Sequence, residues 1–512
     1  MMPSPESSAR PALPSTTTGR VALALGLAGL GLLLTLNAGG YRFGVADQAF
    51  YLPAVEDALD PSLFPHDQPL LDAQGGLEVF AEVSAAASEA SGLSLPWLFA
   101  LGYVAGLGLL LFAAVLVGRR LYASWWAVAA LGLALTFRHR ITGTGVNTAE
   151  GYLHPRTLAF ALGLAAVSAF LVGRTWAMVA LVVAAGVMHP TIGGWFAVWL
   201  GVALAAADPA ARRRLAWLGA AAAALSVWAA TAGPLEGRLV VMDADWLAVL
   251  RSKDYLFPAA WPIEAWVINL GYPVVVVAIF RMRRAEGLAD AREEGLVAGA
   301  LALVGAFLLT LPLVTLKVAL AVQLQIPRMF WMLDLLATVY VVWALVEHPR
   351  WRLARWRGVT VTALLLLSVG RGYYVTVVEG ARKPRGSSVA RLEEHQSDWD
   401  RVMAWLERTP PDAHVLADPG HAWRYGTSVR AAARRDVFLE EVKDAAIAIY
   451  SRDVAMQVAE RTRAIDDFSR LDAARAAGLA ARYDLDYLVS DRPIGLPVVF
   501  RAGTLAVYRL PR

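Results

Sequence analysis

The sequence contains no cysteine and comparatively few charged residues. Without cysteine, the chain can form no disulfide, no thiolate nucleophile and no cysteine-ligated zinc or iron–sulfur site. Charged residues make up 18% of the 512 residues, whereas about a quarter is usual in soluble globular proteins. Hydrophobic residues make up 57%. This balance excludes an ordinary soluble protein and favours one that is embedded in a membrane.

The sequence also lacks the short motifs of common nucleotide- and metal-dependent enzymes. No P-loop, GxGxxG, HExxH or GxSxG pattern occurs in the strand–helix context that it needs. ATP-driven transport and serine or zinc hydrolysis therefore receive no support, and we expect no nucleotide or redox cofactor. The net charge of +4 is spread over many loops, so the basic balance indicates membrane topology and not nucleic-acid binding.

Apolar runs of roughly 17–23 residues recur along the chain, and each is long enough to cross about 30 Å of hydrocarbon as a helix. We interpret the first run as a retained span and not as a cleaved signal peptide, because it is long and the next loop fits a membrane anchor. Residues 1–19, rich in Pro, Ser and Thr, are predicted to be disordered. The predicted spans, about eleven in number, are 21–38, 96–117, 122–137, 157–173, 175–189, 191–207, 215–232, 262–281, 295–314, 329–346 and 358–377.

Arginine is concentrated in every second loop between these spans. Because basic loops stay on the cytoplasmic side, this predicts a multi-pass protein of a bacterial inner membrane with its N-terminus inside and its C-terminal part outside. The two spans that meet at His189 and Pro190 almost without a loop would invert the rest of this topology if they were one helix. The arginine clusters argue against that. These clusters are Arg119–Arg120, Arg174, Arg212–Arg214, Arg281–Arg284 and Arg350–Arg357.

Residues 20–380 thus form the predicted membrane domain. Its first outer loop, 39–94, is acidic and contains two amphipathic stretches, Gln48–Leu59 and Leu77–Ser91. Such stretches fit helices in the plane of the membrane interface and fit solvated loop helices equally well. The segment 315–328 is apolar but ends in Pro-Arg, and we expect it to be a loop along the surface.

Residues 385–512 have a higher charge density and no long apolar runs. Their patterns predict a small soluble α/β domain. The fold class is therefore mainly α, a polytopic membrane helical bundle of about eleven spans with a small C-terminal α/β domain. The expected helices are Asp398–Arg408, 440–460 and 466–482, and the expected strands are His414–Ala417, Tyr487–Ser490, Pro497–Arg501 and Thr504–Leu510.

Asp47 is the leading candidate for a reactive residue. It follows the first span by a few residues, so its carboxylate can lie at the membrane boundary without the cost of burial in hydrocarbon. A carboxylate in that place can act as a general base or as a metal ligand. The alternative is a solvated acidic residue or an N-cap of the helix that follows.

The second outer loop, Arg138–Arg156, is dense in polar residues. It contains arginines although it lies on the predicted outer side, whereas the other arginine clusters lie in predicted inner loops. Its cations Arg138, Arg140 and Arg156 lie on the predicted outer side, where they suit a phosphate or pyrophosphate. The alternative is that they pair with the acidic first loop.

Glu150 and His154 of the same loop are four residues apart, a spacing that on a helix fits a metal pair or an acid–base pair. His189 is expected either to bind a ligand or, as the alternative, to have its polar groups satisfied at the end of a helix. Asp334 stands inside an apolar run and is expected to pair with a cation in the bundle. The other candidates for substrate binding are His139, His189 and Arg328.

Together these features resemble the GT-C class of polytopic glycosyltransferases, which includes the oligosaccharyltransferases and the aminoarabinose and mannosyl transferases. The chain departs from the acidic pair frequent in that class, because Gln48 follows Asp47. The resemblance rests on the long acidic first loop with Ala46-Asp47-Gln48 after the first span, its two amphipathic stretches, the span opening with His154-Pro155-Arg156, and the terminal soluble domain with Trp405–Ala417.

The resemblance implies an inverting glycosyltransferase that moves a sugar from a polyprenyl-phosphate donor to an extracytoplasmic acceptor, with membrane lipids as partners. Asp47 would be the base, and Arg138, Arg140, Arg156 or Arg328 would hold the phosphate, while a divalent cation is a candidate cofactor. The competing hypothesis is a non-catalytic protein, either a lipid-handling or transport protein with an outward cavity or a degenerate GT-C-like scaffold. Inverted repeats would favour a transporter, and the sequence shows no clear repeat.

Overall fold

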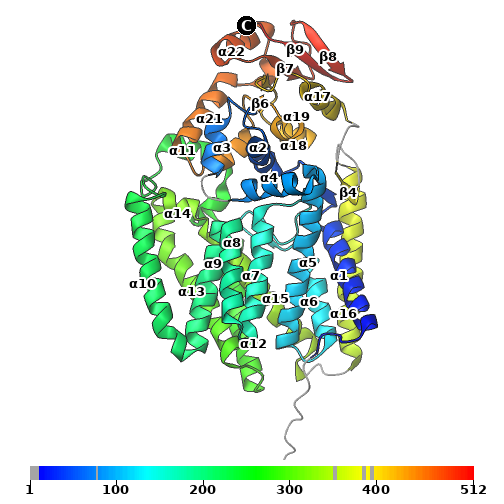
Figure 1. The fold of residues 1–512 in the computed structure, drawn as a ribbon, viewed down its shortest axis with the longest axis vertical. Helices are drawn as coiled ribbons and strands as arrows, with labels where there is room; N and C mark the ends of the chain where they lie inside the picture. The colour runs from blue at the N-terminus through cyan, green and yellow to red at the C-terminus, as the bar shows by residue number, and fades with distance from the viewer. Residues whose placement is uncertain (1–10, 76–78, 350–353, 383–387, 393–396, 512) are drawn as a thin grey trace, which may run out of the picture.

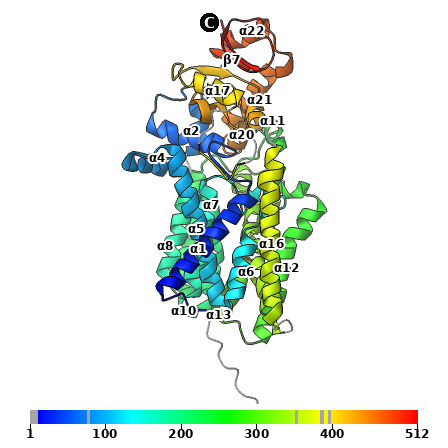
Figure 2. The ribbon, with the colours of Figure 1, turned by 90° about the vertical axis from the view of Figure 1, so that its right-hand side faces the viewer.

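The structure, a computed structural model, describes residues 11–75, 79–349, 354–382, 388–392 and 397–511. Figure 1 shows a bundle of helices that run mostly along the long axis of the molecule, with the C-terminal part of the chain stacked on one end. In the side view of Figure 2, α1 (Thr17–Asn37) and α16 (Ala354–Tyr373) lie next to each other at the front of the bundle.

Among the described residues, eight helical segments are long and apolar enough to cross a membrane, and shorter apolar helices accompany them. Together they account for every predicted span. They are α1, α5 (Leu95–Leu121), α6 (Trp125–Leu135), α7 (Pro155–Leu171), α8 (Thr175–Met188), α9 (Pro190–Ala207), α10 (Pro209–Ala232), α12 (Ile263–Ala285), α13 (Ala291–Thr315), α15 (Phe330–Val346) with the turns before it, and α16 with the π-helical turn Tyr374–Glu379.

Large apolar side chains cover the outer surface of this bundle. Trp176 is 86% exposed, Leu309 80% and Leu225 61%, and no residue of α10 is buried. A soluble protein rarely exposes so much contiguous apolar surface, whereas hydrocarbon accommodates it. The predicted fold class, a polytopic helical membrane bundle, is therefore confirmed.

The arginine-bearing loops that the structure describes gather at the end of the bundle that is remote from the C-terminal domain (Figure 1). Arg120 at the end of α5 pairs with Asp290 before α13 and donates to the carbonyl of Leu171 at 3.1 Å. Arg283 donates to the carbonyl of Leu121 at 3.0 Å. The polar loops lie at the opposite end, against the C-terminal domain (Figure 1). The alternation of basic and polar loops along the sequence thus corresponds to two opposite ends of the molecule.

Two sequence expectations about segment ends need correction. The first helix begins at Thr17, because the Thr16 hydroxyl accepts from the Gly19 N–H and caps it, so residues 17–19, which were expected to be disordered, are helical; residues 1–10 lie outside the described residues. The segment 315–328 is not a surface loop. It forms α14 (Ala319–Gln323) and the turn Ile326–Met329, which are largely buried because their apolar side chains pack into the bundle core.

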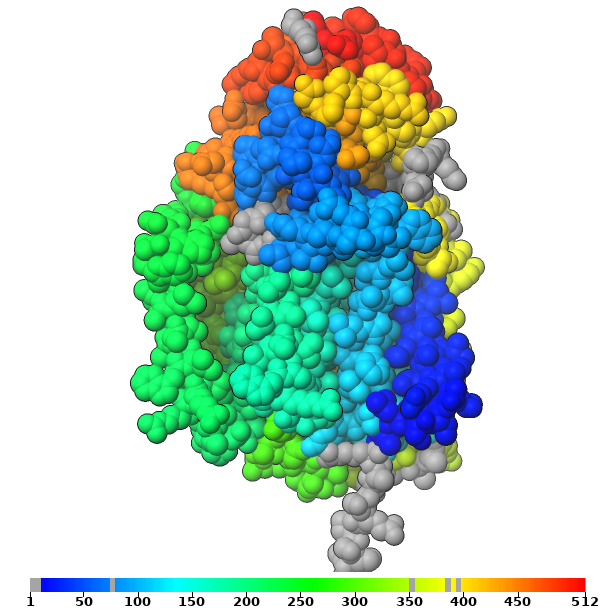
Figure 3. All heavy atoms as spheres, viewed as in Figure 1, coloured from blue at the N-terminus to red at the C-terminus, as the bar shows by residue number. Residues whose placement is uncertain are grey.

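The first outer loop folds into α2 (Gln48–Leu59), α3 (Gln68–Gly75) and α4 (Phe80–Ser91). It lies between the bundle and the C-terminal domain in the space-filling view (Figure 3). Helix α2 has the predicted bounds and packs on α4 and on the C-terminal domain, so seven of its residues are buried. Helix α4 keeps Val83 48% exposed. The first two residues of the predicted second stretch, 77–78, lie outside the described residues, and the place of both helices relative to a membrane surface stays a prediction.

The C-terminal domain is built on a five-stranded mixed sheet of order β6-β5-β7-β9-β8. The predicted strands are confirmed, whereas β6, α18, α19 and the break between α20 and α21 were not predicted. The Ser451 hydroxyl makes that break, because it accepts from the Val454 N–H and starts a new helix. The elements are α17 (Asp398–Leu406), β5 (His414–Leu416), α18 (His421–Tyr425), α19 (Val429–Ala433), β6 (Asp436–Val437), α20 (Glu441–Ile447), α21 (Arg452–Ile465), α22 (Ala473–Tyr483), β7 (Tyr487–Ser490), β8 (Val498–Ala502) and β9 (Leu505–Arg509).

A buried ionic cluster joins this domain to the first outer loop. The Arg430 guanidinium of α19 lies 2.7 Å from Asp67 and 2.5 Å from Asp444, and all three side chains are at most 2% exposed. Arg461 approaches Asp67 at 3.5 Å, and the Val437 N–H donates to the same carboxylate at 3.2 Å. We call Asp67, Arg430, Asp444 and Arg461 the Arg430 cluster. Charges so deeply buried are tolerated only when every partner is in place, so the cluster fixes how the domain sits on the loop.

We expect Asp67→Asn to destabilise the docked arrangement, because it leaves Arg430 and Arg461 buried with one carboxylate fewer. The loss should be about 3–5 kcal/mol of the free energy of unfolding, measured by thermal unfolding in detergent and by protease sensitivity of the C-terminal domain. The control is Glu460→Gln, which breaks an exposed pair with Arg482 (side chains 49% and 64% exposed) and should cost less than about 1 kcal/mol. Equal stability of the two variants would contradict the role of the cluster.

The positive-inside rule predicts that the C-terminal domain lies outside the cytoplasm. A reporter that is active only outside, such as alkaline phosphatase fused after Arg512, should be active, and a reporter fluorescent only in the cytoplasm should be dark. The reverse result would invert the proposed topology of all the spans.

Candidate active site

Of the cavities between the outer-loop end of the bundle and the C-terminal domain, two adjoin Asp47. The larger has a volume of about 600 Å³ and is lined by the first and second outer loops and by the domain. The smaller, of about 140 Å³, is lined by the start of α9, the turn before α15, the end of α20 and the residues that directly follow α20. Asp47 and Arg156 line both, so these two side chains stand where the cavities meet.

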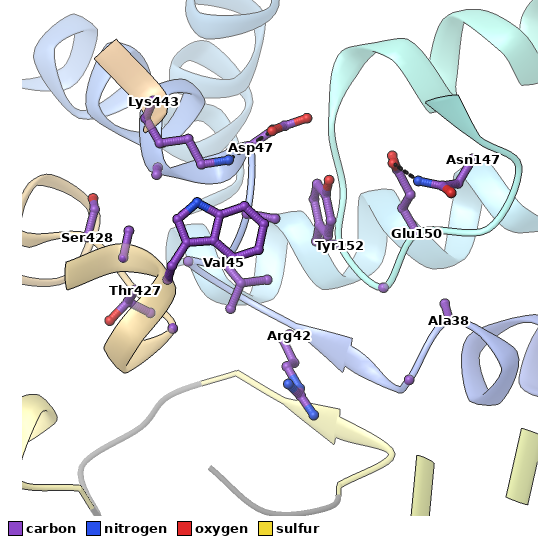
Figure 4. A pocket seen from close by; sticks show the side chains of 18 of the residues that line it. Ala38, Arg42, Val45, Asp47, Asn147, Glu150, Tyr152, Thr427, Ser428 and Lys443 are labelled. Carbon is purple, nitrogen blue, oxygen red and sulfur yellow. Dashed lines mark hydrogen bonds and ion pairs between the residues drawn. The ribbon is translucent and has the colours of Figure 1, made fainter. Parts of the chain in front are cut away.

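Asp47 ends a tight turn in which Ala46 adopts a left-handed φ of 53°, and α2 begins directly after it. Its side chain makes no capping hydrogen bond to that helix, so the capping alternative is wrong. Asp47 Oδ1 instead accepts from Lys443 Nζ at 3.0 Å, and Oδ2 lies 3.5 Å from Arg156 Nη2. Figure 4 shows Lys443 reaching Asp47 from the C-terminal domain. The carboxylate is 29% exposed and is ion-paired, not freely solvated.

The surroundings of Asp47 keep it ionised. Burial would raise the pKa of Asp47, but the positive charges of Lys443, Arg156 and His154 outweigh burial and lower the pKa well below its usual range. The group is therefore available as a carboxylate at every physiological pH, and it is held between two cations from different parts of the chain.

Arg156 at the start of α7 bridges the Asp47 and Glu150 carboxylates. Its Nη2 donates to both oxygens of Glu150 at 3.1 and 3.0 Å, and Glu150 also pairs closely with His154 and accepts from Asn147 at 3.2 Å. Burial raises the pKa of Glu150, but the charges of Arg156 and His154 outweigh it and lower the pKa to about 2. The predicted helical pair of Glu150 and His154 is a contact within an irregular segment that ends where Pro155 starts α7.

These carboxylates do not fit a divalent cation. The Arg156 guanidinium already lies between Asp47 and Glu150, and a metal ion there would meet its positive charge. Among the described residues, no group of three or more His, Asp or Glu side chains is arranged to hold a metal. Asp47 and Glu150 therefore do not provide a site for the candidate divalent cation.

The smaller cavity contains two buried arginines with unused donors. The Nε atoms of Arg156 and Arg328 are buried and have no hydrogen-bond partner among the described residues. Buried donors are nearly always satisfied, and an unmet one costs about 1–3 kcal/mol. Apolar and aromatic side chains, among them Phe50, Tyr255 and Ile447, form much of the remaining wall. The cavity is thus suited to an anionic oxygen group that carries an apolar tail.

His189 lines the same cavity, and the helix-terminus alternative is also realised there. Its Nδ1 accepts from the Ile192 N–H at 3.4 Å and lies 3.1 Å from the Thr191 hydroxyl, so the ring caps α9. One ring nitrogen is thus used by the fold, and the side chain still forms part of the cavity wall.

The structure separates the other predicted residues. Arg138 is exposed and lines the larger cavity. His139 points instead into the bundle, where Nδ1 lies 2.8 Å from Asp334 and Nε2 lies 2.9 Å from the Ala134 carbonyl; this is the partner expected for Asp334. Arg140 is exposed on the short strand β2 (Arg140–Ile141) and lines neither cavity. His139 and Arg140 are therefore not placed to contact a ligand in either cavity.

Sequence reasoning missed the contribution of the C-terminal domain. Lys443 is 396 residues from Asp47 along the chain, and its neighbours Glu440, Glu441 and Asp444 read as an ordinary solvated charged helix. Trp423, which is 71% exposed, and Arg424 also line the larger cavity from this domain. No local pattern marks these residues, because only the docking of the domain brings them to Asp47.

No protein-family model matches the chain, and no curated protein matches it in sequence. Three similar solved structures are of the oligosaccharyltransferase of Archaeoglobus fulgidus: the apo form, the complex with Zn and sulfate, and AglB in complex with an inhibitory peptide and a dolichol-phosphate. They are 12%, 13% and 12% identical to this chain, with TM-scores of 0.46, 0.45 and 0.48. The alignments cover 91%, 91% and 93% of this chain and 69%, 68% and 70% of the other. This is the class that the sequence resembles, and at these values the likeness assigns neither a substrate nor the role of any residue.

Proposed function

We propose that this protein is a membrane glycosyltransferase that moves a sugar from a polyprenyl-phosphate donor to an extracytoplasmic acceptor, with Asp47 as the base. One observation carries the proposal: an ionised carboxylate stands at the junction of two cavities, and the smaller cavity holds two buried arginines with unused Nε donors. A base, an anion site and two separate compartments are what a transfer between two substrates requires.

The donor phosphate would lie in the smaller cavity against Arg156 and Arg328, with His189 nearby. Guanidinium groups bind phosphate oxygens through charge-assisted hydrogen bonds, and the apolar wall suits the first isoprene units of the lipid. The sugar would then project toward Asp47, where the cavities meet. The larger cavity, with Tyr152 and Trp423 in its wall, would receive the acceptor.

The reaction would be a direct displacement at the anomeric carbon. The acceptor hydroxyl or amine forms the new bond to that carbon while its proton passes to Asp47, and the bond from the carbon to the phosphate oxygen breaks with its electron pair on the phosphate. Arg156 and Arg328 stabilise the charge that develops on the departing group. Attack from the side opposite to the phosphate inverts the anomeric configuration.

A non-catalytic lipid-handling or transport protein would use the phosphate site equally but would not need the base. Asp47→Asn therefore distinguishes the two functions. We expect it to lower sugar transfer about a hundred- to ten-thousandfold, where transfer is measured as the polyprenyl phosphate released from a panel of lipid-linked sugars. The binding of a polyprenyl phosphate should not become weaker. The control, Asp72→Asn, changes an exposed carboxylate of the same loop and should leave transfer unchanged. Normal transfer by Asp47→Asn would move the base elsewhere.

Arg328 and Arg138 allow a test of which cavity holds the phosphate, because each lines only one. Arg328→Ala removes charge-assisted hydrogen bonds of about 1.5–3 kcal/mol, so a polyprenyl monophosphate should bind roughly ten- to hundredfold more weakly to the purified protein. Arg138→Ala should change this affinity little. The opposite ranking would place the phosphate in the larger cavity.

A further inference from the structure

We propose that Lys443 of the C-terminal domain is a positioning residue of this site, which holds Asp47 Oδ1 so that Oδ2 is presented to the acceptor. The inference rests on the proposed function for its catalytic meaning, but the ion pair itself can be tested without sugar transfer. It makes the soluble domain an integral part of the chemistry and not an appendage.

The contacts of Asp47 are unequal, and that inequality selects one oxygen. Lys443 Nζ lies 3.0 Å from Oδ1, a full charge-assisted hydrogen bond, whereas Arg156 Nη2 lies 3.5 Å from Oδ2, at the outer limit of such a bond. That Nη2 is also engaged at closer range by Glu150. Oδ2 is therefore the less committed oxygen, and it is the one that can accept a hydrogen bond from an incoming hydroxyl or amine.

Lys443 is held in place from both sides. On the preceding residue, the Val442 carbonyl accepts from Lys253 Nζ at 2.7 Å, a contact with the loop between α10 and α12. On the following residue, Asp444 is fixed by Arg430 at 2.5 Å within the Arg430 cluster. The lysine itself is 9% exposed. Two distant parts of the chain thus fix the backbone around Lys443, and its side chain has little freedom to leave Asp47.

The charges around this pair make it depend on the ionisation of Asp47. Burial and the like charge of Lys443 lower the pKa of Lys253 to about 8, as expected where two ammonium groups lie close together. The negative charge of Asp47 opposes that repulsion. The charged and titratable groups that face Asp47 are Lys443, Lys253, Arg156, His154, Glu150, Tyr152 and Tyr255.

The test is Lys443→Met, which keeps the length of the side chain and removes its charge, with Lys443→Arg as the charge-conserving variant. A positive charge at this distance lowers a carboxyl pKa, so its removal should raise the pH at which Asp47 loses its proton by about one to three units. The measurement is infrared titration of the carboxyl band that is absent in Asp47→Asn. Lys443→Arg should titrate near the wild type. Lys317→Met is the matched control, because Lys317 packs on Phe257 and lines neither cavity.

In transfer assays, Lys443→Met should move the acidic limb of the pH profile upward by the same interval. Although Asp47 becomes more basic in this variant, kcat should fall about tenfold or more, because Oδ2 is no longer held toward the acceptor. Binding of a polyprenyl monophosphate should stay within twofold, because Lys443 does not line the smaller cavity. Unchanged infrared titration in Lys443→Met would overturn the proposal, as would full kcat with an unshifted profile. If Lys443→Met fails to fold, Lys443→Gln and Lys443→Arg give the same contrast between loss and retention of charge.

The two proposals fail in different ways. If the wild type transfers no sugar from any lipid-linked donor, the proposed function is wrong, while the infrared titration still decides whether Lys443 controls Asp47. If the wild type transfers sugar and Lys443→Met transfers it equally at every pH, the function stands and the role of Lys443 is wrong.

Discussion

The pairing of Arg430 with Asp67 and Asp444 determines how the two parts of this protein fit together. The three side chains are buried and come from the first outer loop and from two helices of the C-terminal domain. A guanidinium in such a place is stable only with its carboxylates, and each carboxylate only with its guanidinium. The domain therefore has one arrangement on the loop that satisfies all of them. Asp444 belongs to the helix that carries Lys443, so the same pairing that docks the domain also brings a lysine to Asp47.

The candidate active site also holds buried charges, but its cations outnumber its carboxylates. Arg156 serves Asp47 and Glu150 with one terminal nitrogen and leaves its Nε without a partner among the described residues. Arg328 in the wall of the smaller cavity likewise has an Nε without a partner among the described residues. Each of these two buried guanidinium groups thus keeps an Nε donor without a hydrogen-bond partner among the described residues, although buried donors are usually paired. An anionic ligand is the simplest partner that would complete this arrangement.

Much of the fold was predictable because local patterns of apolar and polar residues determine it. Hydrophobic runs gave each span, alternation gave the strands of the C-terminal sheet, and α2 began and ended at the predicted residues, Gln48 and Leu59. The loop between α13 and α15 was misjudged, because its Pro-Arg ending reads as a surface turn, whereas its apolar residues pack into the bundle. Hydrophobic periodicity indicates which face of a helix or strand is apolar, but it does not indicate which part of the protein packs against that face.

The site was less predictable for a related reason. Asp47, Glu150, Arg156, His189 and Arg328 stood out by their place in the outer loops or at span ends, and the structure brings them to the walls of the two cavities. His154 lines neither cavity and pairs with Glu150. His139 and Arg140 share the same sequence neighbourhood, yet one turns into the bundle toward Asp334 and the other faces outward. Lys443 had no signal at all, since a lysine on a charged helix is ordinary. Which polar residues converge is decided by tertiary docking, and no sequence spacing within one loop encodes it.

The position of Arg156 in both cavities has one further consequence for the proposed transfer. In the structure, Arg156 and Lys443 hold the pKa of Asp47 low, which keeps it ionised but makes it a weak base. A phosphate bound to Arg156 from the smaller cavity would bring negative charge close to Asp47 and offset part of the effect of those cations. Asp47 would then become more basic when the donor is present than when it is absent. A carboxylate controlled in this way accepts a proton most readily at the moment when a sugar is in place to be transferred, and the shared arginine links the two events.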